Sequence, residues 1–187
     1  MARTYDQIDA RMKTWIDQQK IFFVASAPLS GEGMVNCSPK GLGTFRVLDS
    51  QKVAYLDYTG SGAETLAHLR ENGRIVIMMC AFEGRPRIVR FHGHGQAHER
   101  GTQFFDQLSG AFEQLDGARC IITVDLNRIS DSCGYTVPRY TFQGDRQDFQ
   151  HWIERKGPDG VTGYQKKMNR TSLDGLPGMC FGESGET

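Results

Sequence analysis

The feature that most constrains the fold is a series of short apolar segments, each closed by turn-forming residues. The clearest pair is 75–82 and 87–98, separated by the turn Glu83-Gly84-Arg85-Pro86. Residues 75–82 are apolar throughout, and much of 87–98 alternates polar with apolar side chains, as in a strand with one buried face. Two such segments joined by a short turn predict an antiparallel β-hairpin.

Similar segments fill most of residues 20–130, and further strands are expected at 21–25, 34–40, 44–48, 52–58 and 120–126. Apolar residues at helical spacing predict helices at 4–19, 63–72, 101–115, 145–156 and 161–168. Many short strands with a few helical insertions indicate a mainly β, α+β fold built on an antiparallel barrel. We expect one domain over 1–187, with an N-terminal helix in 1–20, the barrel core in 20–130, and C-terminal helices and a tail in 145–187.

Composition narrows the class of partner. Lys and Arg total 22, and Asp and Glu also total 22, so no net charge favours nucleic acid or an anionic membrane. The 5 cysteines form no Cys-x-x-Cys pair, which favours reduced thiols in the cytoplasm over a disulfide framework or a zinc site. The N-terminus resembles no signal peptide, and the longest apolar run is too short to span a bilayer.

The strongest local signal for a ligand is the strand-to-helix corner at residues 58–65. Gly60 and Gly62 let the backbone approach a ligand, while Ser61 and Thr65 add hydroxyl groups beside the start of a helix. These features suit a phosphate. The alternative is that Ser61 simply caps the helix and the glycines form a turn.

A second candidate lies in residues 35–41, followed by Arg46 on the next strand. Lys40 and Arg46 supply the positive charge that a flavin ring and its phosphate require. The alternative is that Ser38-Pro39-Lys40-Gly41 is a strand exit and Lys40 a solvated charge.

Arg90, His92 and His94 share one face of the 87–98 strand, because side chains alternate along a strand. The two histidines could bind a metal or haem, but no carboxylate or thiol partner is evident beside them, so we expect no metal site. Cys133 could be a reactive thiol, but we expect a buried structural thiol instead.

Several runs in chain order resemble the pyridoxamine 5'-phosphate oxidase-like, FMN-binding split β-barrel proteins. They are Asn36-Cys37-Ser38-Pro39-Lys40-Gly41, Phe45-Arg46-Val47-Leu48, Tyr55-Leu56-Asp57-Tyr58, Gly60-Ser61-Gly62 and 68–75. The resemblance covers roughly residues 20–130 and is closer to a subgroup sharing 130–135 and the tail 174–178.

This resemblance implies a six-stranded antiparallel split β-barrel, FMN as cofactor and a homodimer with FMN at the interface. It maps the phosphate onto Arg46 and the corner, although the family often has Arg or Lys where this chain has Glu64 and Thr65. The residues expected to contact FMN are Ser38, Pro39, Lys40, Gly41, Arg46, Tyr58, Thr59, Gly60, Ser61, Gly62, Thr65 and Arg90.

The resemblance also implies an FMN-dependent oxidoreductase acting on a small organic substrate or a reduced nicotinamide. Residues 133–140 lack the Arg-x-His element of true pyridoxamine 5'-phosphate oxidases, which argues against vitamin B6 oxidation. The alternatives are a non-catalytic flavin- or haem-binding barrel and a barrel that has lost its cofactor. No residue is identified as a catalytic acid or base. We expect an ordered tail at 169–178, anchored by Leu173, Leu176 and Met179.

Overall fold

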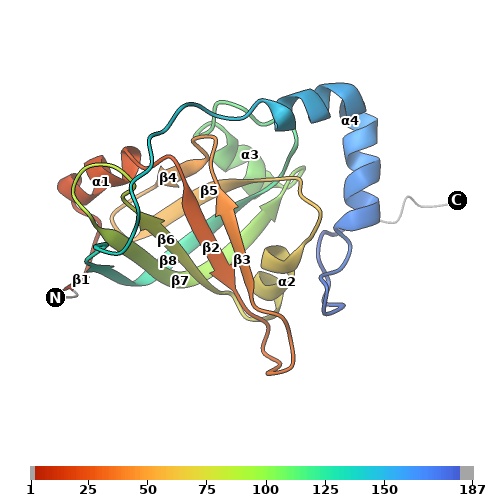
Figure 1. Cartoon of the computed structure of the whole chain (residues 1–187). Helices are drawn as coiled ribbons and strands as arrows, with labels where there is room; N and C mark the ends of the chain where they lie inside the picture. The colour runs from red at the N-terminus through yellow and green to blue at the C-terminus, as the bar shows by residue number, and fades with distance from the viewer. Residues whose placement is uncertain (1–2, 182–187) are drawn as a thin grey trace, which may run out of the picture.

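The structure, a computed structural model, describes residues 3–181 (Figure 1). Its centre is one antiparallel sheet in the order β3-β2-β6-β7-β8-β5-β4, with β1 paired to β8. The strands are β1 (Arg3–Tyr5), β2 (Phe22–Ser26), β3 (Asn36–Lys40), β4 (Phe45–Val47), β5 (Lys52–Tyr58), β6 (Arg74–Cys80), β7 (Ile88–Glu99) and β8 (Ala118–Ser132). The helices are α1 (Ala10–Asp17), α2 (Glu64–Glu71), α3 (Gln103–Ser109) and α4 (Asp148–Met168).

The sheet curls around an apolar interior and stays open between its end strands, β3 and β4. Period-two alternation creates this interior: Phe22 and Val24 of β2 are buried, while Phe23 and Ala25 face outward and are half-buried. A smaller apolar cluster lies on the opposite face of β5 and β8, where Phe105 of α3 and Phe112 cover Ala54 and Ile121.

The predicted hairpin is confirmed as β6 and β7, which pair from Arg74 with His94 to Cys80 with Ile88. The predicted strand at 52–58 is also confirmed, as β5. The mainly β architecture is therefore as expected, but the described residues form eight strands instead of six.

Two strands differ from the prediction because their sequences are polar. β1 occupies the start of the predicted helix at 4–19, and the helix begins only at Ala10, after Asp9 accepts a hydrogen bond from the Met12 amide at 2.7 Å. β8 continues beyond the predicted 120–126 to Ser132, because its second half, in which only Ile129 is buried, pairs with β7 and β1. Pairing partners, not local apolarity, extend these strands.

The C-terminal helices are continuous in space but bent. The two predicted helices are joined in α4, which bends at Gly157 with φ 64° and ψ 169°, directly before Pro158. Proline cannot donate the helical hydrogen bond and glycine tolerates the positive φ, so the helix turns here. α3 is shorter than predicted and ends at Ser109, before Gly110.

The tail after α4 folds back on α2 of its own chain (Figure 1). Thr171 and Pro177 form a β-bridge, and Met179 packs against the barrel interior. Leu173 is 81% exposed, so its predicted role as an apolar anchor is wrong. Backbone amides and Asp174 attach the tail instead, since the Met34 amide donates to Asp174 Oδ2 at 3.0 Å.

Candidate functional site

A buried ion cluster bridges the open edge of the sheet. Asp57, near the end of β5, is fully buried, and its two carboxylate oxygens accept from Lys40 Nζ of β3 at 2.6 Å and from Arg119 Nε of β8 at 2.7 Å. β4 pairs with β5 only as far as Tyr55, so Asp57 lies beyond the end of β4 and can meet Lys40. The cluster thus links three strands through side chains.

Two cations oppose one carboxylate in this cluster. Burial alone would raise the pKa of Asp57, but the charges of Arg119 and Lys40 outweigh it and lower the pKa to about 2. Asp57 is therefore ionised at neutral pH. One unit of positive charge remains in excess.

The strand-to-helix corner is connected to this cluster and to α4. Arg119 Nη1 donates to the Gly62 carbonyl at 2.6 Å, and Asn169 Nδ2 donates to the carbonyls of Gly60 at 2.9 Å and Gly62 at 3.3 Å. Gln165 of α4 donates to the hydroxyl of Thr59 at 2.7 Å. Residues from β8, α4 and the corner therefore hold one rigid turn.

The helix that follows this corner has no side-chain cap. Its N-cap residue is Ala63, and Ser61 is exposed, so the interpretation of Ser61 as a helix cap is wrong. The first amides of α2 thus have no side-chain acceptor in a capping position, and the helix dipole adds partial positive charge there. Such a helix start suits an anionic group.

The inner face of β3 brings further predicted residues to the corner. Asn36 donates to the hydroxyl of Thr65 at 3.0 Å, and Ser38 donates to Asn36 at 3.2 Å. Lys40 continues the same face two residues later. The structure therefore gathers Ser38, Lys40, Thr65 and the 59–62 corner, and their contact with FMN stays a prediction.

Arg46 makes its hydrogen bonds with backbone carbonyls of its own chain. Phe45 faces the barrel interior, so its neighbour Arg46 faces outward, where its guanidinium donates to the carbonyls of Gly43, Phe45 and Ala111. It also lies over the Phe112 ring, with 5.2 Å between the guanidinium carbon and the ring centroid. None of these contacts is with the corner, and the role of Arg46 at the phosphate stays a prediction.

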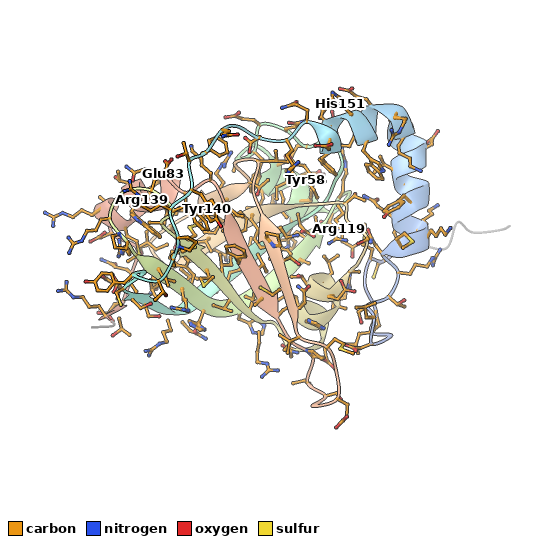
Figure 2. All side chains as sticks on the ribbon, viewed as in Figure 1. Tyr58, Glu83, Arg119, Arg139, Tyr140 and His151 are labelled. Atoms are coloured by element: carbon orange, nitrogen blue, oxygen red, sulfur yellow. The ribbon has the colours of Figure 1, made fainter. Side chains whose placement is uncertain are left out.

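Tyr58 and Arg90 also have other neighbours. The Tyr58 hydroxyl donates to the Gln114 carbonyl at 3.1 Å and its ring lies 4.7 Å from that of Phe149. Figure 2 shows Tyr58 and Arg119 on the side of the sheet facing α4. Arg90, on the outer face of β7, donates to Ser132 at 3.1 Å.

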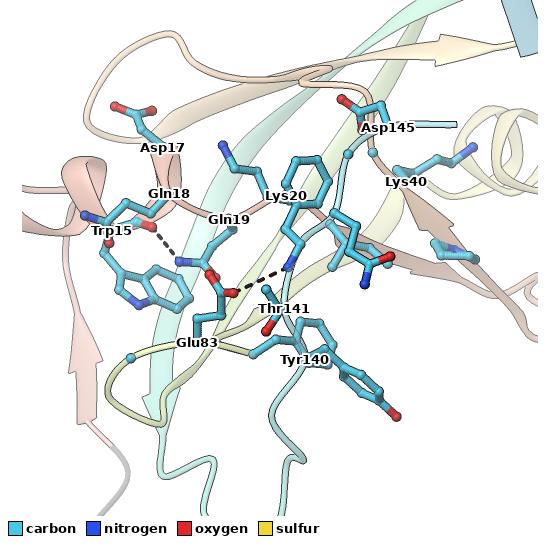
Figure 3. Close-up of a pocket in the computed structure, with 18 of the residues that line it drawn as sticks. Trp15, Asp17, Gln18, Gln19, Lys20, Lys40, Glu83, Tyr140, Thr141 and Asp145 are labelled. Carbon is cyan, nitrogen blue, oxygen red and sulfur yellow. Dashed lines mark hydrogen bonds between the residues drawn. The ribbon is translucent and has the colours of Figure 1, made fainter. Parts of the chain in front are cut away.

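Lys40 also borders a large cleft (Figure 3). Its volume is about 1220 Å³, and Pro39, Lys40 and Gly41 form one end of it. The aromatic residues lining it are Trp15, Phe82, Tyr140 and Phe142. The segment after β8 forms one wall, attached where the Tyr140 amide donates to the Phe82 carbonyl at 3.2 Å and where the Tyr140 and Phe82 rings meet. This cleft is large enough for an aromatic ligand.

Sequence reasoning missed Asp57, Arg119 and Asn169. Asp57 did carry a signal, since period two places it on the face of Val53 and Tyr55, which point into the barrel. A charged residue at a predicted interior position implies a buried partner. Nothing local identified that partner, because Arg119 is 62 residues away.

Metal and membrane sites receive no support from the described part of the chain. His92 is half-buried and His94 exposed on the outer face of β7, and no three His, Cys, Asp or Glu side chains in residues 3–181 are grouped to hold a metal ion. No helix in the same residues combines the length and apolarity needed to cross a bilayer.

Comparison with known proteins agrees with this architecture. Residues 8–133 match the family described as pyridoxamine 5'-phosphate oxidase. The chain is 36% identical over 196 residues to the pyridoxamine 5'-phosphate oxidase family protein ustO of Aspergillus flavus, covering 94% of this chain and 77% of that protein.

Solved structures share the fold at low sequence identity. HupZ of Group A Streptococcus is 22% identical with a TM-score of 0.52, over 67% of this chain and 99% of that chain. A Lactobacillus delbrueckii protein that bears the oxidase name is 13% identical with a TM-score of 0.51, over 68% of this chain and 98% of that chain. The extent of the family match and the identity to ustO together show that this chain belongs to the pyridoxamine 5'-phosphate oxidase family.

Proposed function

We propose that this chain is a flavoprotein oxidoreductase that binds FMN and acts on a small organic substrate or a reduced nicotinamide. The observation that carries the proposal is the corner at residues 59–65, with its uncapped helix start connected to a buried cluster that has one positive charge in excess. Family membership gives the proposal its cofactor class.

The residues present fit a phosphate-bearing flavin. Apart from the chain neighbours Thr59 and Ser61, no described residue has an atom within 4 Å of a Cβ placed on Gly60, so the corner backbone is open to a ligand there. The α2 amides, the exposed Ser61 hydroxyl and the excess charge of Lys40 and Arg119 would hold the phosphate. Bound FMN would supply the hydride and electron transfer.

The chain's own residues would position that cofactor. Asp57 fixes Lys40 and Arg119, and Arg119 and Asn169 fix the corner through the Gly60 and Gly62 carbonyls. A site held by such contacts loses little conformational entropy on binding. The aromatic walls of the 1220 Å³ cleft would exclude water around a planar substrate.

The proposed assembly is a homodimer. Val76 and Met78 of β6 and Phe23 of β2 lie half-buried on the outer face of the sheet, opposite the barrel interior. An apolar outer face of this kind is suited to a twofold interface that repeats one patch on both subunits. The proposed location is the cytoplasm, where the unpaired cysteines would stay reduced.

Identification of the bound small molecule tests the proposal. The purified protein is expected to show flavin absorption bands and, after denaturation, to release a compound with the mass of FMN. A Soret band would indicate haem instead. A colourless protein that ignores added FMN would refute the proposal.

Two substitutions test where the phosphate binds. Because Ser61 is at the corner, Ser61→Ala is expected to weaken FMN binding about 3- to 10-fold while leaving riboflavin binding unchanged. Arg46 bonds to backbone carbonyls, so Arg46→Ala is expected to affect both flavins equally. Selective loss of FMN affinity in Arg46→Ala would instead place the phosphate at Arg46.

A further inference from the structure

We propose that Glu64 is an internal anion that competes with the ligand's phosphate and so sets the affinity of the corner, an inference that rests on the proposed function. Glu64 is the first residue of α2 and is half-buried. Its carboxylate folds back over Gly62, in the space that a Cβ on Gly62 would occupy. The carboxylate therefore lies against the turn that the phosphate must approach.

Electrostatics favour the carboxylate at this place. The start of α2 carries partial positive charge and has no side-chain cap, so an acidic residue in its first turn is stabilised. The neighbouring cations, Lys40 and Arg119, are directed to Asp57. Glu64 thus places a negative charge beside the Gly62 turn, which Arg119 of this cluster also contacts.

The tail holds Glu64 in this position. The Leu173 amide donates to Glu64 Oε1 at 3.3 Å. Leu173 itself is 81% exposed, so the tail makes this contact through its backbone, while Asp174 binds the Met34 amide next to it. The carboxylate thus lies between the Gly62 turn and the tail, and the tail amide holds it there.

A phosphate and this carboxylate cannot both be favourable at the corner, since like charges a few Å apart repel each other. Binding of a phosphate-bearing ligand must therefore displace Glu64 or be weakened by it. A ligand without phosphate does not meet this cost. Glu64 consequently lowers the affinity of the corner for phosphate-bearing ligands below the affinity that the backbone geometry alone would give.

The test compares FMN with riboflavin in a charge series at position 64. Flavin fluorescence quenching is measured on the apo form of the full chain for the wild type, Glu64→Gln and Glu64→Lys. We expect Glu64→Gln to bind FMN about 3- to 10-fold more tightly and Glu64→Lys more tightly still, with riboflavin unchanged. The gain is expected to shrink at high salt, because Glu64 is partly exposed.

Glu71→Gln is the matched control, since Glu71 lies in the same helix at its last turn, away from the corner. It removes the same charge and is expected to change neither affinity. Unchanged FMN affinity across the series, or equal changes for both flavins, would overturn the proposal. So would a Glu71→Gln variant that matched Glu64→Gln.

A separate readout keeps the inference testable if no flavin binds, which would refute the proposed function alone. Melting temperatures are then measured with inorganic phosphate. Glu64→Gln is expected to melt below the wild type without phosphate, because the helix start loses its anion, and to gain more from added phosphate. An equal gain in both proteins would overturn the inference.

Discussion

The carboxylate of Asp57 is completely buried, yet it is ionised because two cations from different strands meet it. Removing one member of such a group leaves the others buried without a counter-charge, which costs more than the pair itself contributes. At the residue scale, Asp57 therefore contributes both to the stability of the fold and to the positions of Lys40 and Arg119 in the proposed site. The same change at an exposed ion pair has little effect.

Asp57→Asn is expected to lower the free energy of unfolding by about 3 to 5 kcal/mol, because Arg119 is left buried beside a neutral amide. Urea denaturation measures the loss. Asp125→Asn is the control, since Asp125 pairs with Lys52 while both side chains are exposed, and it is expected to cost at most about 1 kcal/mol. Equal losses in the two variants would contradict the role of burial.

Asp57 also predicts a pH dependence. Its folded-state pKa of about 2 is below the ordinary value of 3.8, so its stabilising contribution is complete above the ordinary value and is lost as the pH falls through the folded-state pKa. This contribution is on the order of 2 kcal/mol. The stability difference between wild type and Asp57→Asn is therefore expected to narrow as the pH falls from about 5 to about 2 in urea titrations. A constant difference would argue against an ionised Asp57.

At the scale of elements, local sequence predicted those strands and helices whose own pattern decides their state. β5 and β6 carry apolar runs, β7 alternates polar with apolar residues, and clear turns separate them, so these strands were predicted almost to the residue. β1 and the second half of β8 were missed, because their polar residues become strand only through pairing, of β1 with β8 and of β8 with both β1 and β7. The corner was predicted from its glycines, whereas Arg119 and Asn169 reach it from 57 and 107 to 109 residues away, through contacts that no local pattern encodes.

The bend in α4 predicts that a glycine-to-alanine substitution has opposite effects on stability at two positions of this helix. Gly157→Ala is expected to destabilise the protein by about 1 to 3 kcal/mol, because its φ of 64° and ψ of 169° are accessible to glycine alone. Gly163→Ala, in the same helix with no atom near the added Cβ, is expected to stabilise it by about 0.4 to 1 kcal/mol. Thermal unfolding of both variants measures the effects. Stabilisation by Gly157→Ala would show that α4 is straight.

At the scale of the whole molecule, the outer face of the sheet is the surface on which the proposed dimer would form. Val76 and Met78 are half-buried opposite the barrel interior, with Phe23 of β2 paired to Met78. A charged side chain there would have to be desolvated in a twofold interface, and it would occur twice. The barrel interior, formed by the alternate residues of β6, would be untouched.

Light scattering is expected to give a dimer for the wild type and a monomer for Met78→Glu at micromolar concentration. Gln51→Glu, at the exposed turn between β4 and β5, is the control and should stay dimeric. A wild-type monomer would contradict the proposed assembly. A dimeric Met78→Glu protein would place the interface on another face.

The hydrogen bonds from Asn169 to Gly60 and Gly62 have a consequence for biosynthesis. A nascent chain emerges from the ribosome N-terminus first, so the barrel strands are available for folding before residue 169 is made. The corner is therefore completed only after a further 109 residues have been made, since Asn169 lies that far beyond Gly60. Ligand loading is expected to follow the synthesis of Asn169, and a ribosome-stalled chain ending before Asn169 would have the barrel strands without the contacts that finish the corner.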